Sequence, residues 1–314
     1  MADIAGPERL GAAARPRGTL IGAEPLLLAL LAILAAIAFT LPTALDRVVR
    51  WGDFLPGVVV CLALMGVGLY ARLRLGAMRL SAATIGAALF MGFSTLLTVV
   101  IFSLFPLRNP VIDPWLIATD ARLGYHWAGF VMALADYPRV GQLLAHVYNA
   151  AVPMMLAVVM LLGAVGRIEA LHRMLLVSLS SLIIAVAVWW CFPSVGPSAY
   201  QTIPAEVAQS INLVFSAEAG ALLRHLLETG PAVIGRDTVV GVVAFPSYHT
   251  VMACIVVWFT RGTFAFPLAL LAGLAMLPAI LSHGGHNLVD VLGGFALFGA
   301  TAVLAGRCLP DRQS

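Results

Sequence analysis

The stretch from residue 245 to residue 294 decides the fold. It begins with FPSYHT (residues 245–250) and ends with SHGGHNLVDVLGG (residues 282–294). The sequence between these two polar clusters is apolar. We expect it to pass out and back through a membrane as two helices, since a crossing takes about 20 apolar residues. Both clusters then return to the same side, where they can meet.

The composition indicates a membrane protein. Of 314 residues, 61% are hydrophobic and 11% are charged, and the mean hydropathy is +0.99. Soluble domains carry about 25% charged residues. Most of the chain is therefore expected to lie in the lipid bilayer as one cooperative unit. The net charge of +3 comes from dispersed arginines, with no lysine, so no nucleic-acid partner is expected.

Apolar runs predict eight membrane-spanning segments. They are expected to be helices, because lipid offers no hydrogen-bond partner to an open backbone. The fold class is therefore all-α, a polytopic membrane bundle of about eight transmembrane helices. The expected spans are residues 25–43, 54–71, 83–105, 142–163, 173–192, 246–260, 264–281 and 286–306.

The arginines predict the orientation of these spans. Eleven arginines fall on the side that holds both termini, and seven fall on the other side, in much longer loops. The positive-inside rule places the first side in the cytoplasm. We therefore expect a multi-pass protein of the cell membrane with both termini cytoplasmic and both polar clusters facing the extracytoplasmic side.

Two long loops lie on the expected outer side. Residues 106–141 include a partly apolar segment with aromatic residues, 114–135, for which an interfacial helix is plausible. Residues 193–245 include a helix-like segment at 205–229. Loops of this length in a compact protein often serve as lids or binding elements.

The polar clusters carry the residues with chemistry. His286 and Asp290 are four apart, so one helical turn separates them and the carboxylate can orient the imidazole. His249 follows Pro246-Ser247, where Ser247 can cap a helix whose free N–H groups bind anions. Gly285 allows the backbone to approach a ligand closely. The sequence thus predicts a phosphoryl-transfer site at His249, His286 and Asp290, near the headgroup level of the membrane.

Two other functions fit some of these residues. His283, His286, Asp290 and His249 have metal-ligand chemistry, although the His-Glu-x-x-His pattern of metalloproteases is absent. A transporter is the other alternative, but transporters place ionisable groups at the midplane of the bilayer and often show internal repeats. The expected helix centres are almost free of charge, and no repeat is visible.

At these residues the sequence resembles the type 2 phosphatidic acid phosphatase superfamily of integral membrane enzymes. Pro246-Ser247-x-His249 looks like its second signature, and His286-x-x-x-Asp290 looks like the end of its third. The superfamily's first signature, Lys-x6-Arg-Pro, is absent, as is the arginine that usually opens the third. Together with Asp120-x-x-Leu-Gly124, the pattern looks closest to the branch with inositol phosphorylceramide synthases, although Asn287 replaces a frequent tyrosine.

The resemblance implies a domain organisation. A six-helix catalytic core would cover residues 83–306, preceded by two extra helices in 25–82. A cytoplasmic tail at 1–24 and a second tail at 307–314 would flank them.

The resemblance also implies roles for the site residues. His286 would be the nucleophile that forms a phosphohistidine, Asp290 would orient it, and His249 would protonate the leaving alcohol and then deprotonate water or an acceptor hydroxyl. No cofactor or metal is needed in that scheme. The partners are then the lipid bilayer and a membrane lipid phosphate. The expected substrate-binding residues are Ser247, Tyr248 and Gly285, with Arg236 and Arg108 chosen by their side of the membrane and the scarcity of cations there.

Overall fold

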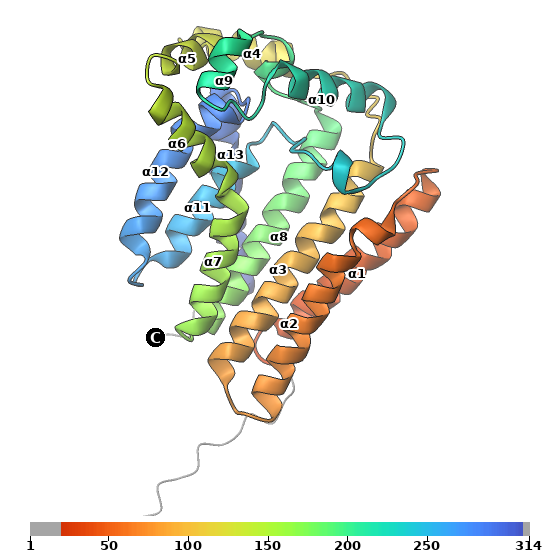
Figure 1. Ribbon diagram of the computed structural model, residues 1–314. Helices are drawn as coiled ribbons and strands as arrows, with labels where there is room; N and C mark the ends of the chain where they lie inside the picture. Colours follow the sequence, from red (N-terminus) through yellow and green to blue (C-terminus); the bar gives the residue numbers. More distant parts are fainter. Residues whose placement is uncertain (1–19, 310–314) are drawn as a thin grey trace, which may run out of the picture.

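The computed structural model describes residues 20–309, and this part of the chain is a bundle of α-helices (Figure 1). It contains thirteen α-helices and no β-strand; one isolated β-bridge joins Val49 to Ile234. The expected tails lie largely outside the described residues. Of the N-terminal tail only residues 20–24 are described, and helix α1 already begins at Glu24. Of the C-terminal tail only residues 307–309 are described.

Six helices within residues 20–309 are long and apolar enough to cross a membrane. Their lengths follow the apolar runs of the sequence, as expected for segments that satisfy their own backbone hydrogen bonds in lipid. The six are α1 (Glu24–Ala44), α2 (Leu55–Leu73), α3 (Met78–Ser103), α8 (Ile168–Cys191), α12 (Phe266–His283) and α13 (Leu288–Cys308).

The expected span at 142–163 is broken into two helices. Helix α6 (Pro138–Asn149) and helix α7 (Ala151–Ala164) meet at Ala150 with a bend of 52°. Pro153 explains the break, because its ring has no N–H to give to the carbonyl of Asn149 and clashes with it. If the bent pair counts as one span, the number of crossings rises to seven.

The expected span at 246–260 is shorter than a crossing. Helix α11 (Tyr248–Thr260) has 13 residues, which gives a length of about 20 Å at 1.5 Å per residue. Hydrocarbon is about 30 Å thick, so α11 is too short to cross it alone. Eight apolar segments are therefore present in the described chain, but α11 does not have the length of a full crossing.

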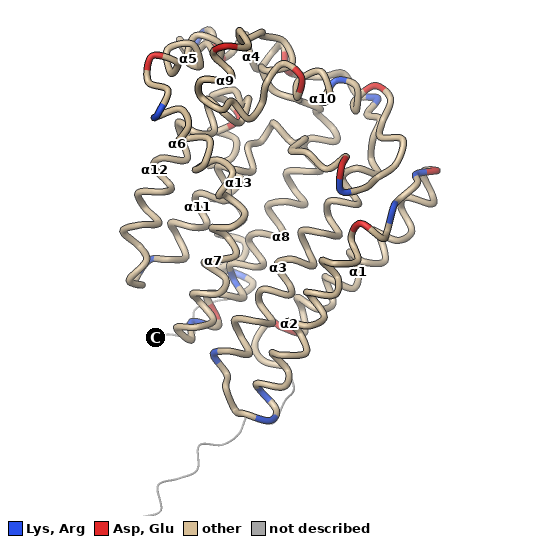
Figure 2. Tube along the Cα trace, viewed as in Figure 1, with Lys and Arg blue, Asp and Glu red and all other residues tan. Residues whose placement is uncertain are grey.

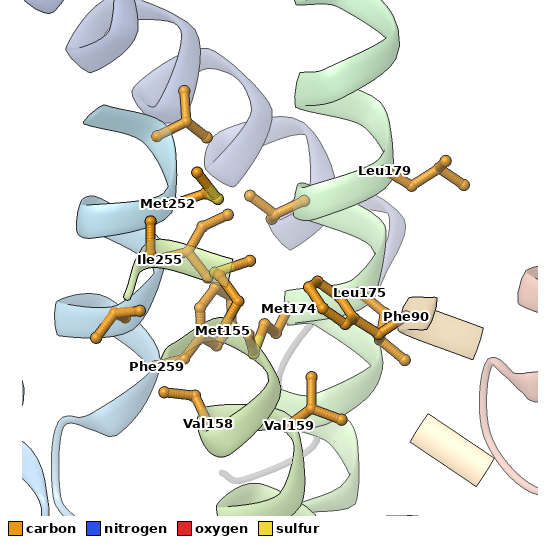
Figure 3. Packing of buried hydrophobic residues seen from close by; sticks show 14 of the residues in the cluster. Phe90, Met155, Val158, Val159, Met174, Leu175, Leu179, Met252, Ile255 and Phe259 are labelled. Carbon is orange, nitrogen blue, oxygen red and sulfur yellow. The ribbon is translucent and has the colours of Figure 1, made fainter. Parts of the chain in front are cut away.

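The core lies between α3, α7, α8 and α11. Met155 of α7, Met174 of α8 and Ile255 of α11 are fully buried and pack together with their neighbours (Figure 3). Glycine allows the closest helix approach: Gly163 of α7 lies directly against the backbone of Ala83 in α3. Small residues at such contacts are the usual means by which helices pack in membranes.

Helices α1 and α2 lie along α3 at the edge of the bundle (Figure 1). A buried ion pair holds them together: the Arg72 guanidinium donates to both carboxylate oxygens of Glu24, at 2.6 and 2.7 Å. The same guanidinium donates through Nε to Ser81 at the start of α3. One arginine thus links three helices.

Charged residues gather at the two ends of the bundle (Figure 2). One end is covered by short helices: α4 (Asp113–Arg122), α5 (Trp127–Leu134), α9 (Ala205–Ser210) and α10 (Ala217–Thr229). The segment 114–135, for which one interfacial helix was plausible, forms α4 and α5 with a turn at Gly124 between them. Trp127 is buried and donates to the carbonyl of Ser282, so this segment packs on the protein.

Candidate active site

The two polar clusters meet at the covered end of the bundle. The backbone N–H of Ser247 donates to the carbonyl of Asp290 at 2.9 Å, which joins the start of α11 to the first turn of α13. The side chain of Ser247 accepts from the N–H of Thr250 at 3.4 Å. The predicted serine cap of this helix is therefore present.

His286 and Asp290 form a buried pair. Nδ1 of His286 lies 3.3 Å from Oδ2 of Asp290, and the two residues are 3% and 0% exposed. An ionised carboxylate can only accept, so with Asp290 ionised the proton of the pair lies on Nδ1 of His286 and the lone pair lies on Nε2. Nε2 faces the hydroxyl of Ser247 at 3.5 Å. His286 itself precedes α13, which Asn287 caps.

His249 faces His286 from the neighbouring helix. The ring centroids lie 6.1 Å apart with an interplanar angle of 62°. On its other side the His249 ring stacks on Tyr148 of α6, with centroids 4.1 Å apart and planes within 17°. Tyr148 falls in the expected span 142–163 and had no expected role in the site, and only the fold reveals that it holds the plane of His249.

A cavity of about 290 Å³ adjoins both histidines. It lies between α3, α7, α8 and α11, beneath the segment 239–244. Most of its wall is aliphatic or aromatic, and His249 and His286 are the only ionisable imidazoles among its lining residues in the described chain. The arrangement places a potential nucleophile and a potential acid at the wall of a mainly apolar chamber.

The sequence pattern of the PAP2 superfamily matches residues 114–304, which is more than half of the chain. The chain belongs to the PAP2 superfamily. The match includes Asp120, His249, His286 and Asp290. No curated protein and no solved structure matches the chain. The narrower likeness to inositol phosphorylceramide synthases is not confirmed by this match.

Membership of the PAP2 superfamily suggests phosphatase or phosphotransferase activity in a helical membrane protein. Of the other expected substrate contacts of this PAP2 chain, some lie at the cavity and some do not. Tyr248 lines the cavity and donates to the carbonyl of Ser178 at 2.9 Å. Gly285 has a positive φ of 57°, and its carbonyl lies against Gly196. Arg108 and Arg236 are exposed, and neither lines the cavity.

The alternative of a metal site rests on His283 together with His249, His286 and Asp290. His283 is fully buried at the end of α12 and does not line the cavity. Within residues 20–309, no group of three or more His, Cys, Asp or Glu side chains is arranged to hold a metal ion.

Two further carboxylates of this PAP2 site come from α4. Asp113 accepts from the N–H groups of Val195 and Gly196, and Asp120 accepts from those of Leu288 and Val289. Burial raises the pKa of Asp113 to about 7 and also raises the pKa of Asp120. From the sequence, Asp120 was included only as part of the Asp120-x-x-Leu-Gly124 pattern, and Asp113 had no expected role. Their spacing of seven residues, two helical turns, was the available signal.

Proposed function

We propose that this protein is an integral membrane lipid phosphate phosphatase or phosphotransferase that works through a phosphohistidine. One observation carries the proposal. His249 and His286 lie on the wall of the same mainly apolar cavity, and Asp290 occupies Nδ1 of His286. A nucleophile oriented by a third group, with a second proton-transfer group opposite, is the arrangement that covalent catalysis requires.

The first chemical step breaks the bond between phosphorus and the leaving alcohol. The Nε2 lone pair of His286 attacks phosphorus, and the P–O bond breaks as His249, in its protonated form, gives a proton to the departing oxygen. Asp290 holds the Nδ1 proton and balances the positive charge that develops on the ring. Preorganised charge of this kind acts strongly in a site that excludes water.

The second step releases the phosphoryl group. Neutral His249 takes a proton from water or from an acceptor hydroxyl, whose oxygen attacks phosphorus while the P–N bond to His286 breaks. Water gives a phosphatase, and an alcohol gives a phosphotransferase. The scheme needs no metal ion, because the enzyme's own groups supply the acid, the base and the nucleophile.

The phosphate oxygens would lie at the start of α11. The first N–H groups of a helix lack partners within the helix and favour an anion. The hydroxyl of Ser247 lies at this helix end and already faces Nε2 of His286. Arg108 and Arg236, exposed on the same end of the bundle, are proposed to meet the headgroup outside the cavity.

The apolar wall favours a lipid over a soluble ester. Phe90, Leu97 and Met155 are among the lining residues, and they leave the part of the substrate next to the phosphate in an apolar environment. Apolar surface buried by a ligand is worth roughly 25 cal/mol per Å². A long-chain alcohol ester gains this energy, whereas a small polar monoester does not.

The test is the activity of the purified protein in EDTA against a panel of lipid phosphates. We expect turnover of long-chain lipid phosphates, poor turnover of water-soluble monoesters, and no turnover by His286→Ala. The Tyr200→Phe variant is a matched control, because Tyr200 is exposed and lies outside the cavity. Loss of all activity in EDTA, or equal turnover of both substrate classes, would contradict the proposal.

A further inference from the structure

Helix α4 presents two buried carboxylates toward the site. Asp113 and Asp120 are seven residues apart and therefore lie on the same helical face. They are 0% and 2% exposed, and each binds the backbone of a different site segment. A ten-residue helix thus reaches two segments that are far away in the sequence.

Asp120 binds the first turn of α13. Its Oδ2 accepts from the N–H of Leu288 at 2.7 Å, and its Oδ1 accepts from the N–H of Val289 at 3.1 Å. The next N–H toward the N-terminus, that of Asn287, donates to Asp290 at 2.8 Å. Three successive N–H groups at the start of α13 are therefore bound by carboxylates of the protein itself.

The N-terminus of α13 therefore differs from the N-terminus of α11, which also lies at the site. A carboxylate at a helix N-terminus stabilises the helix end, because its negative charge faces the positive end of the helix dipole. It also occupies the donors that an anion would use. A substrate phosphate is thus excluded from the start of α13, whereas the start of α11 is capped only by the neutral side chain of Ser247.

Asp120 also fixes the position of the nucleophile. His286 lies two residues before Leu288, on a segment where Gly284 and Gly285 permit several backbone conformations. Because Asp290 and Leu288 belong to the same helical turn, holding that turn holds the partner of Nδ1 as well. A displacement of about 1 Å in a catalytic group can lower the rate on the order of 10²-fold.

We propose that Asp120 is a positioning residue: it anchors the first turn of α13, so that His286 points its Nε2 into the cavity and the phosphate binds at α11. This role rests on the proposed function. It gives the Asp120-x-x-Leu-Gly124 element a purpose, since α4 ends at Arg122 and the chain turns at Gly124, with φ 79°, four residues after the anchoring residue.

The experiment replaces the carboxylate and then restores it from solution. Asp120→Ala leaves a space of carboxylate size beside the N–H groups of Leu288 and Val289. We expect kcat to fall on the order of 10²-fold, with a much smaller change in KM. Sodium formate should restore a substantial part of kcat, and sodium chloride at equal ionic strength should not. Asp136→Ala, which removes an exposed carboxylate, should match the wild type with and without formate.

Asp120→Asn covers the case in which the alanine variant does not fold. The amide fills the same space and offers one acceptor instead of two, so we expect a smaller loss of kcat that formate does not restore. A folded Asp120 variant with wild-type kcat, or a loss that formate and chloride change equally, would overturn the role of Asp120 alone. An inactive wild type would overturn the proposed function and this role with it.

Discussion

The carbonyl group of Gly285 occupies the space that a side chain on Gly196 would fill. Gly196 also has a positive φ of 85°, and its N–H donates to Asp113 at 2.7 Å. The segment held by Asp113 is thus packed directly against the segment that carries His286. Any side chain at Gly196 must push these two segments apart.

Gly196→Ala should therefore lower activity without unfolding the bundle. Both the contact with Gly285 and the positive φ oppose a side chain, so we expect a loss on the order of 10²-fold in kcat. Gly299→Ala is the matched control, because a side chain there meets no neighbour and alanine favours a helix. Steady-state kinetics of both variants measures this loss. Equal kcat values for the two variants would show that the contact between Gly196 and Gly285 does not affect activity.

Asp113 should make stability depend on pH. Burial and the charge of Asp290 raise its pKa from 3.8 to about 7, against the lowering effect of the N–H groups of Val195 and Gly196. A raised pKa means that the folded state binds the proton more tightly. The contribution of Asp113 to stability is therefore complete below about pH 4 and is lost as the pH rises through about 7.

The size of this effect is at most about 4 kcal/mol, at 1.36 kcal/mol per pH unit. We expect the melting temperature of the wild type to fall between about pH 5 and pH 8, and that of Asp113→Asn to change less over the same range. Thermal unfolding in detergent at several pH values measures this difference. Parallel curves for the two proteins would show that Asp113 does not titrate in this range.

The Glu24–Arg72 pair should stabilise the edge of the bundle. Arg72→Met leaves Glu24 buried with its charge unpaired, and breaking a buried pair costs about 3–5 kcal/mol. Arg74→Met is the control, since Arg74 is exposed two residues away. We expect a clear fall in melting temperature for the first variant alone. The double variant Glu24→Gln, Arg72→Met should recover part of the loss, and failure to recover would exclude an unpaired charge as its cause.

The proposed topology places the site on the extracytoplasmic side. A reporter that is active only outside the cytoplasm should be active when fused after residue 215, in the loop before α10, and silent when fused after Ser314. The arginine distribution is the physical reason for this expectation. The opposite pattern of reporter activity would place the site on the cytoplasmic side.

Much of the fold follows directly from hydrophobic pattern. The apolar runs correctly predicted helices in six long segments, because lipid leaves the backbone no alternative. The break at Ala150 was also encoded, in Pro153, but a run of apolar residues on both sides concealed it. The expected span 246–260 was already short, which agrees with the 13 residues of α11. That α11 is shorter than the helices around it could be seen only in the fold.

The site was predicted less completely. His286 with Asp290 could be paired from sequence, because a local spacing determines whether they meet. Tyr148 and Asp113 could not, since the residues that they contact, His249 and Gly196, lie more than 80 positions further along the chain. Arg108 and Arg236 were chosen by their side of the membrane and the scarcity of cations there, and neither criterion tells how far a side chain lies from a cavity.

The most direct test of the account is the phosphoenzyme. Wild type and variants are mixed with a labelled phosphate ester that has a good leaving group, such as a nitrophenyl ester in micelles, and quenched rapidly. Acid-labile phosphate is then counted and mapped. We expect label on His286 in the wild type and in His249→Ala, because a good leaving group departs without an acid, and no label in His286→Ala. Label that persists in His286→Ala, or that maps to His249 or His283, would contradict the account.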